Sequence, residues 1–210
     1  MKKTYALVIV LVVLLLLAPC ATAAPESKPE VDVLSGLEAL AISYTDQRTV
    51  YIGVFEVSGN TYLLYLLGFA DENGDYHVYA PVDADLYLGG MFPVVEIDKD
   101  SANIDPKFLS ASVSSVPVTI ADMYGTSSET KDITINAYWT STSDITRNLP
   151  YHYIDTDGDV SISTSASRTA TITGSISGSG DENIDMDLGT ADFMAGIGRG
   201  LTVRVTKDPS

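Results

Sequence analysis

The sequence contains few of the residues that carry most metal and nucleophile chemistry. Cys20 is the only cysteine, and His77 and His152 are the only histidines among 210 residues. A lone cysteine excludes a disulfide framework within the chain. Two histidines far apart in sequence, without cysteines, do not indicate a zinc site. We therefore expect a domain that is held together by its hydrophobic core alone.

Basic residues are also scarce, with 12 Lys and Arg against 28 Asp and Glu and a net charge of −16. Nucleic acids are bound by clustered Lys and Arg, so this composition excludes a nucleic-acid partner. The acidity favours solubility and self-repulsion between copies. It also raises the hypothesis of a bound divalent cation.

Recognisable catalytic motifs are missing as well. The sequence has no Gly-x-Ser-x-Gly nucleophile elbow. The glycine-rich stretch 196–200 lacks the spacing of a dinucleotide-binding loop and precedes a predicted strand. We predict a non-enzymatic protein. The alternative is an extracellular hydrolase whose catalytic carboxylates come together only in the folded chain.

The first 23 residues have the layout of a secretory signal peptide. Lys2 and Lys3 precede an apolar run over residues 6–18, and small residues at 21–23 form a cleavage site. The run is about 13 residues long, shorter than the roughly 20 that a membrane-spanning helix needs. We expect residues 1–23 to be removed and the mature protein to be secreted or displayed at the cell surface.

Two other interpretations of this segment remain open. One is an uncleaved N-terminal anchor. The other is lipid attachment at Cys20, because Leu17-Ala18-Pro19-Cys20 resembles a lipobox. Lipoboxes have Gly, Ala or Ser where Pro19 stands, which favours simple secretion. No later apolar run reaches membrane length, so the sequence predicts no membrane span in the mature chain.

The mature chain divides into a leader and one domain. Residues 24–38 are Pro-rich and charged, which is typical of a flexible leader. Residues 39–210 show strand patterns separated by turns. The later strands alternate between apolar and polar residues, which favours a single antiparallel β-sandwich domain with immunoglobulin-like character. The expected strands are 49–57, 61–70, 108–115, 118–124, 132–140, 160–165, 168–177, 183–188 and 201–207.

The hairpin 49–70 differs from the later strands, because it is apolar on both alternating faces. A strand pair of this kind must be covered on two sides. The pair either lies in the middle of the sandwich, or its second cover comes from outlying segments of the chain or from another molecule. A self-assembling subunit, in which the leader adds a strand to a neighbouring copy, is therefore a second hypothesis for function.

An acidic run near the middle of the chain is a candidate cation site. Asp155, Asp157 and Asp159 alternate and could place oxygens around Ca²⁺. A calcium-binding loop needs Gly at its sixth position and Glu at its twelfth, and Val160 and Ala166 stand there. The competing interpretation is a polar turn that leads into the strand from Val160.

Aromatic residues suggest one further class of ligand. The chain has 12 Tyr, and tyrosine rings stack on sugars in carbohydrate-binding proteins. Tyr138 and Tyr151 are the best candidates for exposed rings. Trp139 alternates with isoleucines, which predicts a place in the core. The possible partners are thus a second copy, another extracellular protein or a carbohydrate.

The second half of the chain resembles a family of uncharacterised secreted β-rich proteins. A strand that ends in Trp139-Thr140 is followed by a polar turn with Arg147, and then by an Arg168-Thr-Ala-Thr-Ile-Thr-Gly174 strand. The resemblance covers roughly residues 107–206. It implies export and a β fold. We accordingly predict a secreted or cell-surface protein that acts by binding or as a component of a surface layer.

Overall fold

The computed structural model describes residues 30–45, 48–84, 86–88, 92–124, 129–154 and 160–206. Nearly all of these residues lie in β-strands, and η1, a 3-10 turn at Lys99–Ser101, is the one helical element among them. The predicted all-β class is confirmed. The expected signal peptide, Cys20 and the three aspartates of the candidate cation site lie outside the described residues.

Eight strands form a closed, fully antiparallel circuit. The hydrogen-bonded order is β2-β1-β14-β12-β9-β8-β4-β3, and β3 pairs with β2 again to complete it. Shorter strands border this circuit at several points. The circuit consists of β1 (Glu30–Tyr44), β2 (Arg48–Val57), β3 (Asn60–Ala70), β4 (Tyr76–Pro81), β8 (Ser110–Asp122), β9 (Thr130–Ser141), β12 (Val160–Ser177) and β14 (Met194–Thr206). The bordering strands are β5 (Leu86–Leu88), β6 (Phe92–Ile97), β7 (Ala102–Ile104), β10 (Thr146–Arg147), β11 (Tyr151–Ile154) and β13 (Met186–Asp187).

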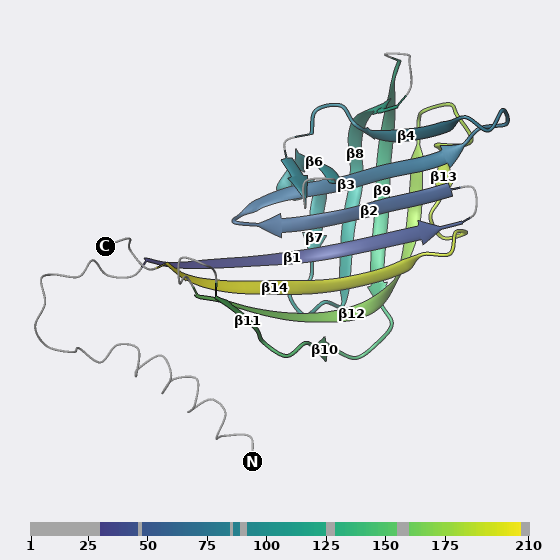
Figure 1. Ribbon diagram of the computed structural model, residues 1–210. Helices are drawn as coiled ribbons and strands as arrows, with labels where there is room; N and C mark the ends of the chain where they lie inside the picture. The colour runs from purple at the N-terminus through teal and green to yellow at the C-terminus, as the bar shows by residue number, and fades with distance from the viewer. Residues whose placement is uncertain are drawn as a thin grey trace, which may run out of the picture.

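The circuit is flattened into two layers that cross each other. In Figure 1, β1, β2, β3 and β14 run across the direction of β8 and β9. The long strand β12 belongs to both layers, because residues 160–170 pair with β14 and residues 170–177 pair with β9. The predicted antiparallel sandwich is thus confirmed. Immunoglobulin domains pack two separate sheets with aligned strands, whereas here one strand carries the hydrogen bonding from layer to layer.

Gly174 permits the close pairing of β12 with β9. Its φ is +125°, and a Cβ at this position would collide with the carbonyl oxygen of Asn136 on β9. Only glycine combines this backbone conformation with so near a neighbour. This position therefore fixes how the second half of β12 lies against β9.

The hydrophobic core fills the space between the two layers. On β9 the alternate residues Ile133, Ile135, Ala137 and Trp139 are at most 1% exposed, so the predicted core position of Trp139 is confirmed. β-branched and aromatic residues favour strands because they pack well on a pleated, half-buried surface. The period-2 pattern of the sequence and the buried face of β9 therefore coincide.

The doubly apolar hairpin becomes β2 and β3. On one face, Val50, Ile52 and Val54 belong to the core. On the other, Leu64 is 3% exposed next to its register partner Val94 of β6. The ring of Phe92, also on β6, lies 5.1 Å from the ring of Tyr51. An outlying segment of the same chain thus supplies part of the second cover.

The predicted leader is wrong in its second half. We expected flexible chain to residue 38, but β1 begins at Glu30 and pairs with β14 continuously from Glu30–Thr206 to Ile42–Met194. The physical reason is the alternation that follows Pro29, since Val31 and Val33 pair by register with Val205 and Val203. Proline and charge at 24–30 obscured this strand in the sequence.

Candidate functional site

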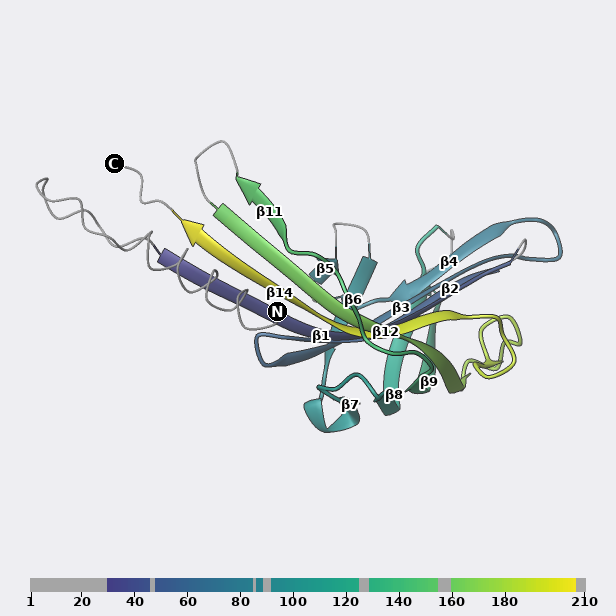
Figure 2. The same ribbon diagram turned by 90° about the horizontal axis from the view of Figure 1, so that it is seen from below.

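Four strands continue past the end of the core and form what we call the sheet extension. It comprises residues 30–35 of β1, 201–206 of β14, 160–165 of β12 and 151–154 of β11. Figure 2 shows these strands side by side, projecting away from the crossing layers. Beyond Gly198 on β14, and before Ala170 on β12, no described residue is fully buried.

A cation over an aromatic ring marks the point where the core stops. The Arg199 guanidinium lies 6.0 Å from the centre of the Phe108 ring, which is 4% exposed. An arginine can cover the end of an apolar core in this way, because its charge interacts favourably with the face of the ring. Past this cap, the second layer supplies no further cover to the extension among the described residues.

One face of the extension is apolar. Paired residues of antiparallel strands share a face, so the register places Val205, Val160 and Ile154 in one row across three strands. The next row holds Val203 and Ile162, followed by His152, and the third pairs Leu201 with Thr164. Ile154 is 66% exposed, and the β12 and β14 members of these rows are partly exposed. We call this surface the apolar face.

The opposite face of the extension is polar. It carries a run of small hydroxyl residues on β12, and the Ser163 Oγ lies 2.9 Å from the Thr202 Oγ1 across the strand pair. An antiparallel sheet with one polar and one apolar face normally packs the apolar one against a second layer. The members of the polar face are Ser161, Ser163, Ser165, Thr202, Arg204, Tyr151 and Tyr153.

The apolar face is of moderate size. Its three strands are spaced about 4.8 Å apart and contribute four to six residues of about 3.3 Å each, which gives a footprint of roughly 250 Å². The largest apolar patch on a typical monomer covers about 300–600 Å² and often has a function. The apolar face is therefore a candidate contact site.

The extension also has a free edge. The ladder between β1 and β2 begins at Gly36, which pairs with Val57. Residues Glu30 to Ser35 of β1 therefore pair with β14 on one side only, within the part of the chain that the structure describes. A free edge presents backbone N–H and C=O groups to which another strand can add.

Away from the extension, a cluster of one histidine and two aspartates joins β4 to β8. The His77 Nδ1 lies 2.7 Å from the Asp122 Oδ2, and the His77 Nε2 lies 3.7 Å from the Asp71 Oδ2. The Asp122 Oδ1 also accepts a hydrogen bond from the Val78 N–H at 3.1 Å. The hydrogen bond to Asp122 is the main cause that raises the pKa of His77, and its attraction outweighs the opposing effect of burial.

This cluster is a clamp rather than a catalytic dyad. A histidine oriented by an aspartate is the base of a Ser-His-Asp triad, but its other ring nitrogen must face a nucleophile. Here that nitrogen faces the carboxylate of Asp71, which itself accepts backbone hydrogen bonds from Asn73 and Asp75. Those hydrogen bonds, with that from Asp75 first, lower the pKa of Asp71. The clamp ties the turn before β4 to β8.

A cavity of about 330 Å³ lies at one end of the core, lined in part by Ser43, Arg48 and Asp185. Its polar groups serve the surrounding loop. The Arg48 Nη2 donates to the backbone oxygen of Asn183 at 2.6 Å, and the Asp185 Oδ1 accepts hydrogen bonds from the N–H and the hydroxyl of Ser179. The Arg48 side chain thus holds the loop that precedes β13.

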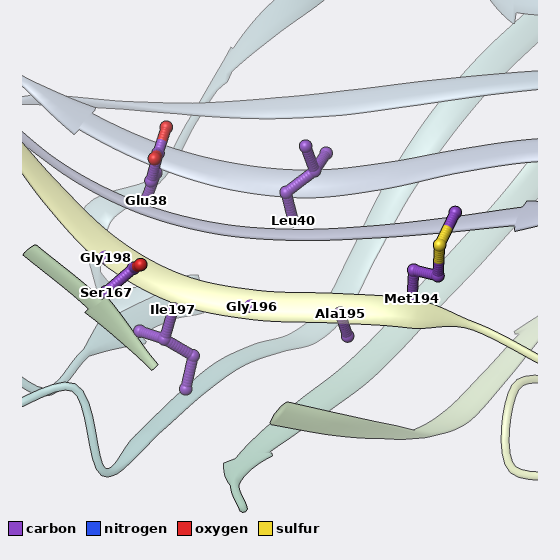
Figure 3. Close-up of a pocket in the computed structure, with 8 residues that line it drawn as sticks. All are labelled: Glu38, Leu40, Ser167, Met194, Ala195, Gly196, Ile197 and Gly198. Atoms are coloured by element: carbon purple, nitrogen blue, oxygen red, sulfur yellow. The ribbon is translucent and has the colours of Figure 1, made fainter. Parts of the chain in front are cut away.

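A shallower groove of about 280 Å³ lies on the outer surface of β1 and β14. Figure 3 shows Glu38 and Leu40 on one side of Gly196 and Gly198, while Ile197 points the other way. A Cβ at Gly198 would lie 2.9 Å from the carbonyl oxygen of Ala166, so close strand packing requires glycine there. The groove follows from that packing. The Glu38 side chain is exposed at the groove, and partial desolvation by the neighbouring sheet raises its pKa.

The sequence-predicted residues have varied outcomes. Asp155, Asp157 and Asp159 lie outside the described residues, so the Ca²⁺ site stays a prediction. The described ranges contain no cluster of three or more His, Cys, Asp or Glu able to hold a metal ion. Tyr138 and Tyr151 are 44% and 66% exposed, as expected, but they stand on β9 and β11, which do not pair with each other.

Sequence reasoning missed the apolar face. A usable signal was the length of the strands, since β1, β12 and β14 have 15, 18 and 13 residues. Typical strands have about 5–6 residues. Apolar alternation that persists to the ends of such long strands, as at Val203 and Val205, indicates a sheet that outgrows its core.

The described residues include no helix that is both long enough and apolar enough to cross a membrane. Comparison with family models, with curated proteins and with solved structures found no match to this chain. The resemblance of residues 107–206 to secreted β-rich proteins therefore stays a prediction. The candidate site rests on geometry alone, and that site is the apolar face of the sheet extension with its free edge.

Proposed function

We propose that this protein is an exported, non-enzymatic subunit that acts by holding a partner against the sheet extension. One observation carries the proposal: an apolar sheet face with a footprint of roughly 250 Å² has no second layer among the described residues. The signal-peptide layout of residues 1–23 supports export. A role in a surface layer requires a second contact besides this one, because one face per chain joins molecules only in pairs.

The polar clusters support binding over catalysis. His77 is engaged by two carboxylates, and Arg48 is bonded to the backbone of the loop that it holds. Each cluster thus has a structural task that explains its residues. The extracellular hydrolase remains the alternative, and no arrangement in the described residues favours it over binding.

The balance between apolar burial and the cost of association shows how much surface the partner must contribute. Covering roughly 250 Å² of apolar surface gains about 6 kcal/mol at about 25 cal/mol per Å². Association costs about 4–15 kcal/mol of lost freedom. The apolar face alone therefore supports weak binding, and a partner that presents its own apolar surface raises the gain.

A neutral hydrophobic dye tests whether the face is open. We expect dilute protein to enhance the fluorescence of Nile red, and the variant Ile162→Asp to lose most of this enhancement. Ser163→Asp is the matched control, because it adds the same charge one residue away on the polar face. Equal dye binding by wild type and Ile162→Asp would contradict the proposal.

A further inference from the structure

We infer that the partner of the sheet extension is a second copy of this chain, packed with its apolar face against the first around a twofold axis. This inference rests on the proposed function and names the partner of the same site. A twofold contact uses one surface twice, so it requires only that the apolar face be complementary to itself.

The charge distribution favours this contact. The chain carries a net charge of −16, so two copies repel each other over most of their surface. The described positions of the apolar face carry no Asp, Glu, Lys or Arg. They are Leu201, Val203, Val205, Val160, Ile162, Thr164, Ile154 and His152. Here two copies approach without bringing carboxylates together.

The shape of the face also suits a sheet-on-sheet contact. Two sheets pack about 10 Å apart when side chains from both inner faces interdigitate. Rows of valine and isoleucine, such as Val203 beside Ile162, give the ridged surface that such packing uses. Burial of roughly 500 Å² in total lies below the about 1,200–2,000 Å² of stable interfaces, so we expect a weak, reversible dimer.

Edge-to-edge pairing of β1 is the main competing arrangement. It uses the free edge at residues 30–35, where Glu30 and Asp32 stand. Charged residues on an edge strand oppose such pairing, and pairing would leave both apolar faces uncovered. The face-to-face arrangement covers them, which is why we commit to it.

Light scattering during size exclusion tests the inference on protein purified from an exporting host, after intact mass has identified its processed form. We expect a molar mass that rises with concentration from one chain to two. Raising NaCl from about 0.05 M to about 0.5 M is expected to strengthen association, because it screens the repulsion between acidic copies.

Ile162→Asp is expected to weaken association at least about a hundredfold, since two carboxylates per dimer must leave water and each costs more than a factor of ten. Ser163→Asp, on the polar face, is expected to leave it unchanged. A mass of one chain under all conditions overturns the inference. If Nile red still reports an open face in that case, the proposed function stands; if it does not, both fall.

Cross-linking separates the two arrangements. In the face-to-face dimer, a short bis-maleimide is expected to join two copies of Val203→Cys but not two copies of Asp32→Cys, because residue 32 is paired with Arg204 of the polar face. Edge-to-edge pairing gives the reverse result, because it brings the two β1 strands together. Cross-linking of Asp32→Cys alone therefore overturns the inference.

Discussion

The clamp between His77 and Asp122 predicts how stability depends on pH. The proposed change is His77→Asn, whose amide N–H can take the place of the Nδ1 donor but does not titrate. The folded pKa of His77 lies above its ordinary value, chiefly because of the hydrogen bond to Asp122. A raised pKa means that the charged form stabilises the fold below the unfolded pKa, and that this contribution is lost as pH rises through the folded pKa.

The structure sets the size of the contribution that charged His77 makes to the free energy of unfolding. The contact with Asp122 is 2.7 Å long, and the Asp122 side chain is only 7% exposed, but the His77 side chain is 29% exposed. A hydrogen bond to a charged group contributes about 1.5–3 kcal/mol, and solvent at the exposed ring reduces this to about 1 kcal/mol. The contact with Asp71, at 3.7 Å, adds little.

The assay is urea unfolding at about pH 5.5 and at about pH 8.5, either side of the ordinary histidine pKa of about 6.5. We expect wild type to lose about 1 kcal/mol of unfolding free energy on going to the higher pH, and His77→Asn to lose much less. A slope in His77→Asn equal to that of wild type would refute the reasoning.

Three further substitutions, two of them with a matched control, test the fold by denaturant unfolding. Gly174→Ala should lower the free energy of unfolding by about 3 kcal/mol or more, because φ is +125° and the new Cβ meets the Asn136 carbonyl. Its control is Gly59→Ala, which is also at positive φ but in open space and should cost about 1 kcal/mol. Trp139→Ala should lower the free energy of unfolding by about 3–5 kcal/mol, since the side chain is fully buried. Its control is Tyr138→Ala, at the neighbouring exposed position, which should cost about 1 kcal/mol or less. Arg48→Met should lower the free energy of unfolding by about 1–2 kcal/mol, because the hydrogen bond to the Asn183 backbone is lost. Amide hydrogen exchange in the turn 181–185 should also become faster. Unchanged exchange there would contradict the role of Arg48 in holding this loop.

The sequence predicts the most strongly patterned strands, such as β2, β3 and β9, but it divides β8 and β12 into shorter strands. It also places the glycine-rich stretch 196–200 before the last strand, whereas this stretch lies within β14. Alternation on β9 identified Trp139 as a core residue, and doubly apolar β2 and β3 required two covers. Period and residue type decide such features locally. The closed circuit and the role of β12 in both layers depend on which strands pair over long separations, and local patterns do not contain that information.

The candidate site was less predictable for the same reason. Whether Val203 and Ile162 are core residues or surface residues depends on how far the second layer reaches, and Arg199 on Phe108 marks that limit only in the folded chain. The beginning of β1 was hidden because Pro29 and the charges around it resemble a linker. Long alternating strands are the one local sign of an extension.

Thiol labelling tests most directly whether the apolar face is open. Cys20 is removed with residues 1–23, or replaced as Cys20→Ala if intact mass shows that it remains, so each variant has one thiol. In dilute protein, Val203→Cys is expected to react with neutral iodoacetamide within about tenfold of an unfolded chain, as a partly exposed thiol should. Ala137→Cys, at a fully buried position, should react only on unfolding. Protection of Val203→Cys equal to that of Ala137→Cys at the lowest concentration would show that the face is covered within one chain, and would contradict the account.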